Sequence, residues 1–288
     1  MQFNRPLIIC LCLFAVINPS AMAQDVQSTA PVQNTPLLPL EPFNTTGFYE
    51  VAWSGITAGG MVIDAFEDDT SYRMQVNVKS NGIAWAFTKH ESSTTLEGIK
   101  TADIYVPQKF ETYFKLRGKT RHIVLDYDAQ GNLVHEINTP PENRDKRPAV
   151  PMELKKNVVD ALTPFFLQRH KVYEALRNGQ QKFTIRMYDG RRLTDMHYFV
   201  QGRKQVGWNM QDIPVIHFSM SRTPVAGYKD SELEDIANKK DPSVSLYLSD
   251  DGRLIPLKIV VDTTAGNFYA NFKHACDTMA ACVKHLNK

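Results

Sequence analysis

The sequence predicts a mainly β protein: a curled antiparallel sheet, as an open barrel or β-spiral, with one principal α-helix packed on it. Several segments alternate apolar and polar residues with a period of two, which is typical of strands with one wet face. Such strands favour antiparallel pairing, because the strands of a parallel sheet are covered by helices on both faces. Asp-Gly and Gly-Gly pairs between the segments favour the turns and bulges that let a sheet curl.

The 288-residue chain has the composition of an ordinary globular protein, with 43% hydrophobic and 22% charged residues. Its 33 Lys and Arg residues nearly balance 31 Asp and Glu residues, which gives a net charge of +2. This balance leaves no excess positive charge for a phosphate backbone, so we expect no nucleic-acid partner. No apolar run reaches the roughly 20 residues of a membrane-spanning helix, so we expect no membrane span.

Residues 1–23 have the three regions of a cleaved signal peptide in the right order. Arg5 precedes an apolar run at residues 7–17, which is too short to span a bilayer. Ala21-Met22-Ala23 then forms a cleavage site of the small-x-small type. We therefore expect cleavage after Ala23 and a periplasmic location.

Two further units are predicted after the signal peptide. Residues 24–46 carry four prolines among Gln, Ser, Thr and Asn, and this composition predicts a flexible leader without regular elements. Residues 47–288 are predicted to form a single β-rich domain.

The clearest predicted strands lie at residues 72–79, 122–127, 182–187 and 243–248. Asp189-Gly190 predicts a tight hairpin turn between residues 182–188 and 191–200, because this pair adopts the positive φ values that such turns need. Arg191 and Arg192 follow the turn and could bind an anion. Arginines at hairpin ends are usually solvated, and we favour that interpretation.

The principal helix is predicted between residues 160 and 178. Thr163-Pro164 resembles an N-cap with proline at the first helical position, and a start at Asp160 is the alternative. Asn178-Gly179 ends the helix. We expect it to lie across one mouth or face of the curled sheet.

Cys276 and Cys282 remain once the signal peptide is removed, and in an exported protein such a pair favours a disulfide bond. On one α-helix these side chains would lie about 120° apart and about 9 Å along the axis, which exceeds the reach of a disulfide. The bond therefore requires a bend, which we place in a hairpin or loop at residues 277–281 after a strand at 267–275.

The chain shows no motif for catalysis, metal binding or phosphate binding. None of the eight histidines pairs with another at the spacing of a metal-binding face, and no Gly-x-Ser-x-Gly sequence occurs. We expect no catalytic residue, no metal and no cofactor.

Aromatic residues are the most suggestive candidates for a binding site. In a curled sheet, aromatic side chains that face inward can line an apolar cavity, and the alternative is that they fill a solid core. The candidate ligand-lining residues, expected on strands or at strand ends, are Tyr49, Trp53, Tyr72, Trp85, Phe110 and Phe114.

Five short motifs lie in order along residues 47–262. They are YEVAWSG at 49–55 with Gly-Gly at 59–60, Tyr72 with SNGIA at 80–84, DALT at 160–163, YDGRR at 188–192 and DGRLIPLKI at 251–259. In this order they resemble the exported bacterial family called domain of unknown function 3108. The resemblance implies a periplasmic, β-rich protein without an established activity, and it supplies no catalytic residues. The architecture looks similar to that of periplasmic lipoprotein carriers, whose half-open sheet holds acyl chains under a helix.

Three functions remain open at this point. We expect a periplasmic protein that binds or carries an apolar envelope ligand such as a lipid. The alternative is a non-enzymatic interaction or scaffold protein that holds another envelope protein, and the second alternative is a hydrolase with a dispersed site. An apolar cavity would favour the ligand-binding function. A solid core with an exposed apolar patch would favour the interaction or scaffold function. A cleft with converging titratable groups would favour the hydrolase.

Overall fold

The computed structural model describes residues 36–208, 211–238, 243–264 and 266–287. The expected signal peptide at 1–23 and the first part of the expected leader lie outside the described residues. Within the described ranges, no helix combines the length and the apolar character needed to cross a membrane.

Across the described ranges, 13 strands form one antiparallel sheet in the order β7-β6-β5-β4-β3-β2-β1-β13-β12-β11-β10-β9-β8. The mainly β prediction is confirmed, and the alternation at residues 72–79 places four buried side chains on one face of β3. The strands are β1 (Asn44–Trp53), β2 (Ile56–Glu67), β3 (Ser71–Ser80), β4 (Glu91–Thr101), β5 (Ile104–Leu116), β6 (Lys119–Tyr127), β7 (Leu133–Thr139), β8 (Lys182–Tyr188), β9 (Leu193–Trp208), β10 (Gln211–Ala226), β11 (Ser243–Ser249), β12 (Pro256–Thr263) and β13 (Gly266–Ala275).

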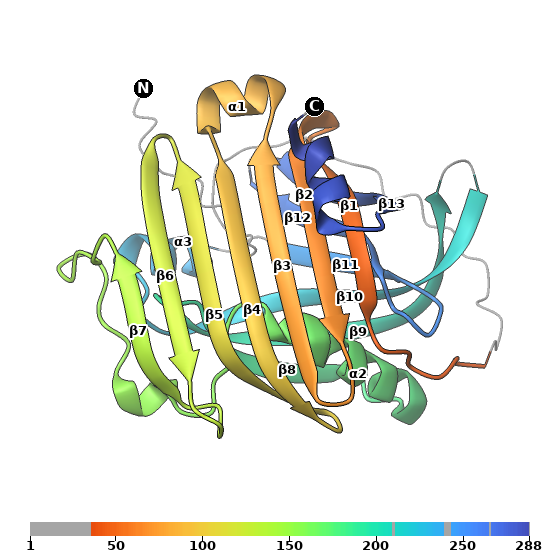
Figure 1. Ribbon diagram of the computed structural model, residues 1–288, viewed down its shortest axis with the longest axis horizontal. Coiled ribbons are helices and arrows are strands. Elements are labelled where there is room, and N and C mark those ends of the chain that lie inside the picture. Colours follow the sequence, from red (N-terminus) through yellow and green to blue (C-terminus); the bar gives the residue numbers. More distant parts are fainter. Residues whose placement is uncertain (1–35, 209–210, 239–242, 265, 288) are drawn as a thin grey trace.

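The sheet curls into two layers that share one core. In Figure 1, β1 to β7 form the front layer and β8 to β11 run across behind it, with α2 at the lower end. The core contains buried side chains from both layers and from α2. The remaining elements are α1 (Gly82–Thr88), α2 (Thr163–Asn178), α3 (Asp230–Ala237), α4 (Met279–Val283), η1 (Met152–Lys155) and η2 (Lys284–Asn287).

Helix α2 ends at the predicted residue and begins one residue earlier than the predicted N-cap allows, because Leu162 is the N-cap and Thr163 is the first helical residue. Pro164 occupies the first turn, and Asp160 accepts hydrogen bonds from the backbone N–H groups of Leu162 (2.6 Å) and Thr163 (3.0 Å). Asp160 thus satisfies N–H groups that have no partner within the helix. Gly179 ends the helix in the left-handed conformation, with φ of 70°.

Side chains bridge the two edges of the sheet, β7 and β8. The hydroxyl of Tyr188 on β8 donates to Glu136 on β7 at 2.9 Å, and Lys155 of η1 donates to the same carboxylate at 2.7 Å. The strand order gives no ladder between β7 and β8, so the barrel is open in its hydrogen bonding. Polar contacts from the connecting segment close it instead.

The prediction that Arg191 and Arg192 are solvated is wrong, because both side chains are buried. Arg191 binds Glu142, and Arg192 binds Asp189 at 2.8 Å. The segment at residues 140–151 folds over the hairpin and supplies Glu142. Tertiary contacts of this segment therefore bury a pair that local sequence places at an exposed turn.

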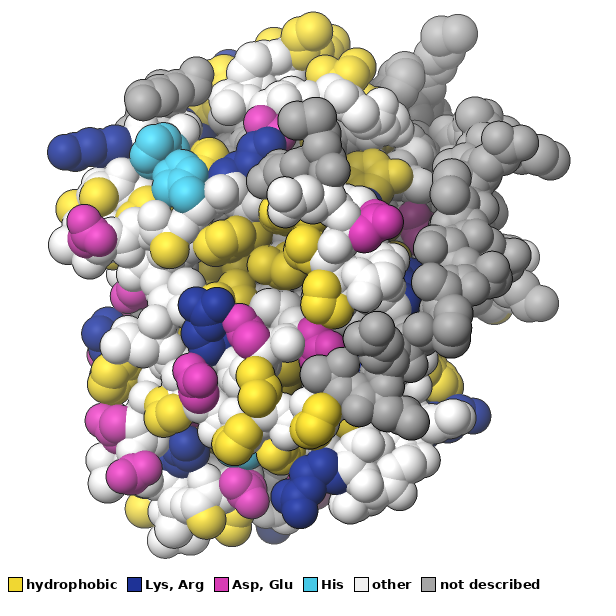
Figure 2. Space-filling model, turned by 90° about the vertical axis from the view of Figure 1, so that its right-hand side faces the viewer, with side chains coloured by type: hydrophobic (Ala, Val, Ile, Leu, Met, Phe, Trp, Pro, Cys, Tyr) yellow, Lys and Arg dark blue, Asp and Glu magenta, His cyan; other side chains and the backbone are white. Residues whose placement is uncertain are grey.

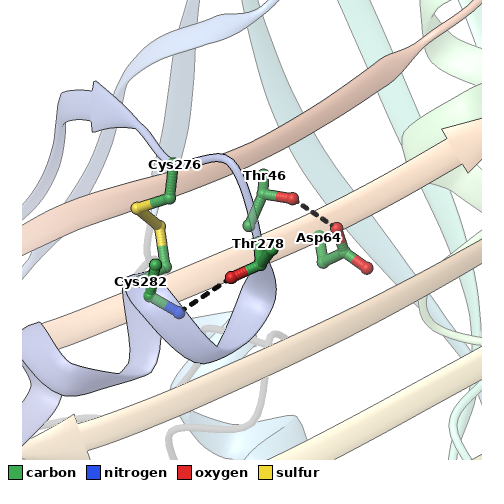
Figure 3. Close-up of a disulfide and its surroundings, with 6 residues drawn as sticks. Thr46, Asp64, Cys276, Thr278 and Cys282 are labelled. Carbon is green, nitrogen blue, oxygen red and sulfur yellow. Dashed lines mark hydrogen bonds between the residues drawn. A yellow bond between two sulfur atoms is a disulfide. The ribbon is translucent and has the colours of Figure 1, made fainter.

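The C-terminal segment returns over the outer face of the sheet. Cys276 and Cys282 form a disulfide with Cα atoms 5.6 Å apart, and Figure 3 shows the bend between them. The predicted bend is confirmed, but α4 begins inside the expected loop, at Met279. Cys282 and Leu286 pack with Val62 of β2 in a small apolar cluster outside the main core.

The end of the expected leader belongs to the fold. Strand β1 begins at Asn44, and the preceding Phe43 is buried with its ring edge-on to Phe165 of α2. The backbone N–H of Phe43 donates to Glu67 at 2.9 Å. The folded domain therefore starts before residue 47, because one aromatic ring in a proline-rich segment finds a place in the core.

Breaking the Cys276–Cys282 bond is expected to lower the free energy of unfolding by about 2 kcal/mol, because the bond constrains a short loop in the unfolded chain. Urea denaturation followed by circular dichroism, with and without reductant, measures the difference. The double variant Cys276→Ser/Cys282→Ser is the control and should not respond to reductant. An unchanged midpoint of the parent protein in reductant would contradict the prediction.

Candidate functional site

The six predicted ligand-lining aromatics separate into three groups. Tyr72, Phe110 and Phe114 are buried in the front layer, and Tyr49 is buried on β1. Trp53 lies four residues after Tyr49 on β1 and is 44% exposed. The prediction that Trp85 lies on a strand or at a strand end is wrong, because it lies within the short helix α1, with Lys79 Nζ 5.9 Å from its ring.

The α2 end of the core is filled by ring contacts. Phe166 of α2 lies 5.0 Å from Tyr72 and 5.8 Å from Tyr105, measured between ring centroids. Gly98 faces Tyr72, and a Cβ there would lie 2.3 Å from the ring, so glycine makes room for the aromatic side chain. Tyr72 therefore acts as a core residue at this end.

A buried ion pair lies beside these rings and joins α2 to the sheet. Arg169 is fully buried, and its Nη1 donates to Glu67 Oε1 at 2.6 Å. Its Nη2 donates to the backbone carbonyls of Glu41 (2.9 Å) and Arg253 (2.8 Å). One guanidinium thus ties α2 to β2, to the chain before β1 and to the β11–β12 loop.

The ion pair continues into a chain of titratable groups. The hydroxyl of Tyr105 donates to Glu67 Oε2 at 2.5 Å and lies 2.7 Å from His170 Nε2. Burial opposes ionisation of Glu67, but Arg169, Tyr105 and the Phe43 N–H outweigh it and lower the pKa of the carboxyl. Burial lowers the pKa of His170. This arrangement holds Glu67 ionised and His170 neutral. We name the Arg169–Glu67 pair, with Tyr105 and His170, the structural lock, because it fixes α2 against the sheet.

Within the part of the chain that the structure describes, no group of three or more His, Cys, Asp or Glu side chains is arranged to hold a metal ion.

At the α1 end, cross-strand register assembles an apolar row on the inward face. Trp53 lies opposite Ile56 of β2 and Phe268 of β13, and opposed residues share a face of the sheet. The row continues through Val261, Val244, Met220, Tyr198 and Phe183.

Exposure rises toward one end of this row. Val261 and Val244 are buried, Phe268 is half-buried, and Trp53 and Ile56 are exposed. Trp53 and Phe268 stack with ring centroids 6.1 Å apart and planes 17° apart. We name Ile56, Trp53 and Phe268 the apolar rim.

The next row inward lies behind the apolar rim and is made of small residues. Val51 lies opposite Gly59 on one side and Ala270 on the other, and Val51 is only half-buried although it packs on the core. We name the surface between the apolar rim and this row of smaller side chains the recess. On the face shown in Figure 2, hydrophobic side chains gather in a central hollow with charged side chains around it.

A separate surface hollow of about 570 Å³ lies beside η1. It is lined by Asn132, Leu133, Met152, Glu153, Lys155 and Lys156. Four of these six side chains are polar or charged, and none of the six predicted aromatics lines the hollow. It is therefore a less suitable surface for an apolar ligand than the apolar rim.

A buried polar patch lines the inner face between α1 and the core. Ser80 Oγ accepts from the His90 backbone N–H at 3.0 Å, and Thr94 and Thr112 share a hydrogen bond of 2.8 Å. His90 is buried, and burial lowers its pKa to about 4, so its ring is neutral at pH 7.

Comparison with known proteins identifies the family. Residues 49–273 match the model of a family described as "Protein of unknown function (DUF3108)". The chain belongs to this family. The DUF3108 match covers most of the domain and confirms the resemblance carried by the five motifs. A comparison with curated proteins gives no significant match.

A solved structure shares the fold of this DUF3108 chain. It is the crystal structure of a β-barrel-like protein of domain of unknown function DUF1849 from Brucella abortus. The likeness covers 84% of this chain and 100% of that one, with a TM-score of 0.50 and 11% sequence identity. At this identity the likeness concerns the fold alone and supports the barrel-like architecture.

Two residues of the site carry signals that the sequence analysis missed. Phe268 alternates with Ala270 and Phe272 within the predicted strand at 267–275, which marks one face of β13. Arg169 lies three residues from both Phe166 and Val172, so it occupies the apolar face of the predicted helix. A charge on such a face indicates a buried partner.

Removing one member of the Arg169–Glu67 pair is expected to lower the free energy of unfolding by about 3–5 kcal/mol, because the other charge stays buried. Arg169→Met and Glu67→Leu test this in urea denaturation, and the double variant should lose less than the sum. Arg186→Met is the matched control, because its pair with Asp195 is partly exposed and should contribute less than about 1 kcal/mol. Equal losses for Arg169→Met and Arg186→Met would refute the structural lock.

Protonation of His90 is expected to destabilise the fold in mild acid. The unfolded chain binds a proton below pH about 6.5, while the folded chain resists until about 4, so stability falls as pH drops through that window. The full loss is about 3 kcal/mol, and His170 contributes in the same direction. His90→Gln should flatten the profile between pH 6.5 and 4.5. Parallel profiles for the parent protein and His90→Gln would contradict the assignment.

Proposed function

We propose that the protein binds an apolar ligand, such as a lipid acyl chain, against the apolar rim in the cell envelope. The stacked pair of Trp53 and Phe268 carries the proposal. Trp53 is exposed and Phe268 is half-buried on the inward face of the sheet, whereas Val261, Val244 and Tyr198 farther along the row are buried. Exposed flat rings above small apolar residues suit a slender apolar chain.

The expected affinity follows from the number of methylene groups that the ligand would bury in the recess. About ten methylenes buried there would contribute about 8 kcal/mol at about 0.8 kcal/mol each. Costs of association reduce this value, so we expect micromolar or weaker binding. Such binding suits a carrier or a sensor that releases its ligand.

An exported location is part of the proposal. The predicted signal peptide at residues 1–23 and the Cys276–Cys282 pair both support it, because disulfides persist in oxidising compartments such as the periplasm.

A binding role is also proposed in preference to catalysis. The buried carboxylate of Glu67 is neutralised by Arg169, and its hydrogen-bond chain joins Tyr105 and His170. These contacts favour a rigid support for α2 over a reacting group.

A scaffold role is the second candidate, and strand β7 favours it. Val134 and Ile137 are exposed on this strand, and exposed apolar side chains can mark a contact surface for another protein. Crosslinking in the envelope that captures a protein at β7, with no ligand at the apolar rim, would place this role first.

Ligand binding is tested with a dansyl-labelled undecanoic acid probe and the protein isolated from the periplasm without detergent. Trp53→Ala should weaken probe binding about tenfold, because the ring forms one wall of the recess. Tyr113→Ala is the matched control: its ring is 47% exposed, close to the 44% of Trp53, but it is not in the row. Equal effects of the two changes, or no probe binding by the parent protein, would count against the proposal. Mass spectrometry of an organic extract identifies any ligand that co-purifies.

A further inference from the structure

Helix α1 projects from one end of the sheet (Figure 1). Its apolar side chains Ile83 and Phe87 are exposed to water. Its sequence, GIAWAFT, contains no charged residue, and no residue of the helix is buried. Ile83 and Phe87 are 70% and 71% exposed and lie four residues apart, so they share one face. Apolar side chains gathered in this way on a surface mark a site of interaction.

Hydrogen bonds at both ends of α1 determine that this face is exposed. The backbone N–H of Asn81 donates to the carbonyl of Ala58 at 3.0 Å. At the other end, the Thr88 hydroxyl donates to Ser80 Oγ at 3.0 Å and contacts the Ala84 carbonyl at 2.7 Å. These bonds secure both ends of the helix to β2 and β3 and leave Ile83 and Phe87 outside the core.

Basic side chains surround the helix. Exposed Lys89 follows α1 directly, and the β5–β6 turn reaches it through a hydrogen bond of 2.7 Å from the Arg117 N–H to the Thr88 carbonyl. Exposed Lys119 begins β6, directly after this turn. Lys79 and Lys115 lie on the neighbouring strands, opposite the single acid Glu91. The described residues around α1 thus carry five basic side chains and one acidic side chain.

We propose that the α1 end docks on the surface of an anionic lipid bilayer. Ile83 and Phe87 enter the boundary between headgroups and acyl chains, while Lys89, Arg117 and Lys119 bind lipid phosphates. Apolar side chains flanked by Lys and Arg are the composition of segments that lie in the membrane interface. The charge complementarity selects an anionic surface, and a projecting helix of seven residues suits a deformable interface better than the broad area of a stable protein–protein contact.

This proposal goes beyond ligand binding and does not depend on it. Ile56 of the apolar rim is exposed at the same end of β2, so a docked bilayer would lie close to the recess. The two proposals have separate readouts, since vesicle binding reports the docking surface and the dansyl probe reports the recess.

The experiment measures co-flotation of the purified protein with vesicles of phosphatidylethanolamine and phosphatidylglycerol (7:3), against vesicles of phosphatidylcholine. The parent protein should bind the anionic vesicles at least tenfold better, and added salt should weaken the binding. Ile83→Asp/Phe87→Asp should lower binding at least tenfold. Lys89→Glu/Arg117→Glu/Lys119→Glu should remove the preference for anionic vesicles.

The matched control is Ile99→Asp/Ile104→Asp, which introduces two acids at exposed apolar positions by the β4–β5 turn, at the opposite end of these strands. It should bind vesicles as the parent protein does. Melting curves confirm that each variant is folded, and probe binding should be retained by Ile83→Asp/Phe87→Asp. The proposal is overturned if the parent protein does not bind anionic vesicles, if the control loses binding equally, or if binding survives in Ile83→Asp/Phe87→Asp.

Discussion

The guanidinium of Arg169 holds together segments that are far apart along the chain. It is fully buried, pairs with Glu67 of β2 and donates to backbone carbonyls at Glu41 and Arg253. A buried charge is tolerated only when its partners are in place, so α2 docks in one position and orientation. The aromatic packing of Phe166 against Tyr72 and Tyr105, the burial of Phe43 and the filled end of the core depend on that position.

The segment between β7 and β8, which contains α2, also closes the open barrel. Strands β7 and β8 are joined by side chains, with Glu136 receiving hydrogen bonds from Tyr188 and Lys155. The connection that carries α2 also supplies Glu142, which buries Arg191. The same segment therefore fills the core and closes the gap between the edges. An unpaired edge is a common route to aggregation, and covering it protects the fold.

The two ends of the molecule differ in chemistry because α2 occupies only one of them. At the α2 end, rings and the ion pair leave the core solid. At the α1 end, Trp53 and Phe268 lie one row farther from the core than Gly59 and Ala270. The exposed apolar side chains of α1 lie at the same end of the sheet. The core is filled at the α2 end, whereas apolar side chains are exposed at the α1 end. We therefore place the proposed binding at the α1 end.

The sequence by itself determined the mainly β class, the limits of α2 and the bend between Cys276 and Cys282, because alternation, capping and helix geometry are local properties. It also led to the family through short motifs. The tertiary structure alone decided that Arg169 and Arg191 are buried and that Trp85 lies on a helix. It also decided that Trp53, but not Tyr72, is exposed on the inward face. The carboxylate partners of Arg169 and Arg191 lie more than 40 positions away along the chain, and Trp53 lies in register with Phe268 of a distant strand. No local pattern encodes which distant partner a side chain meets.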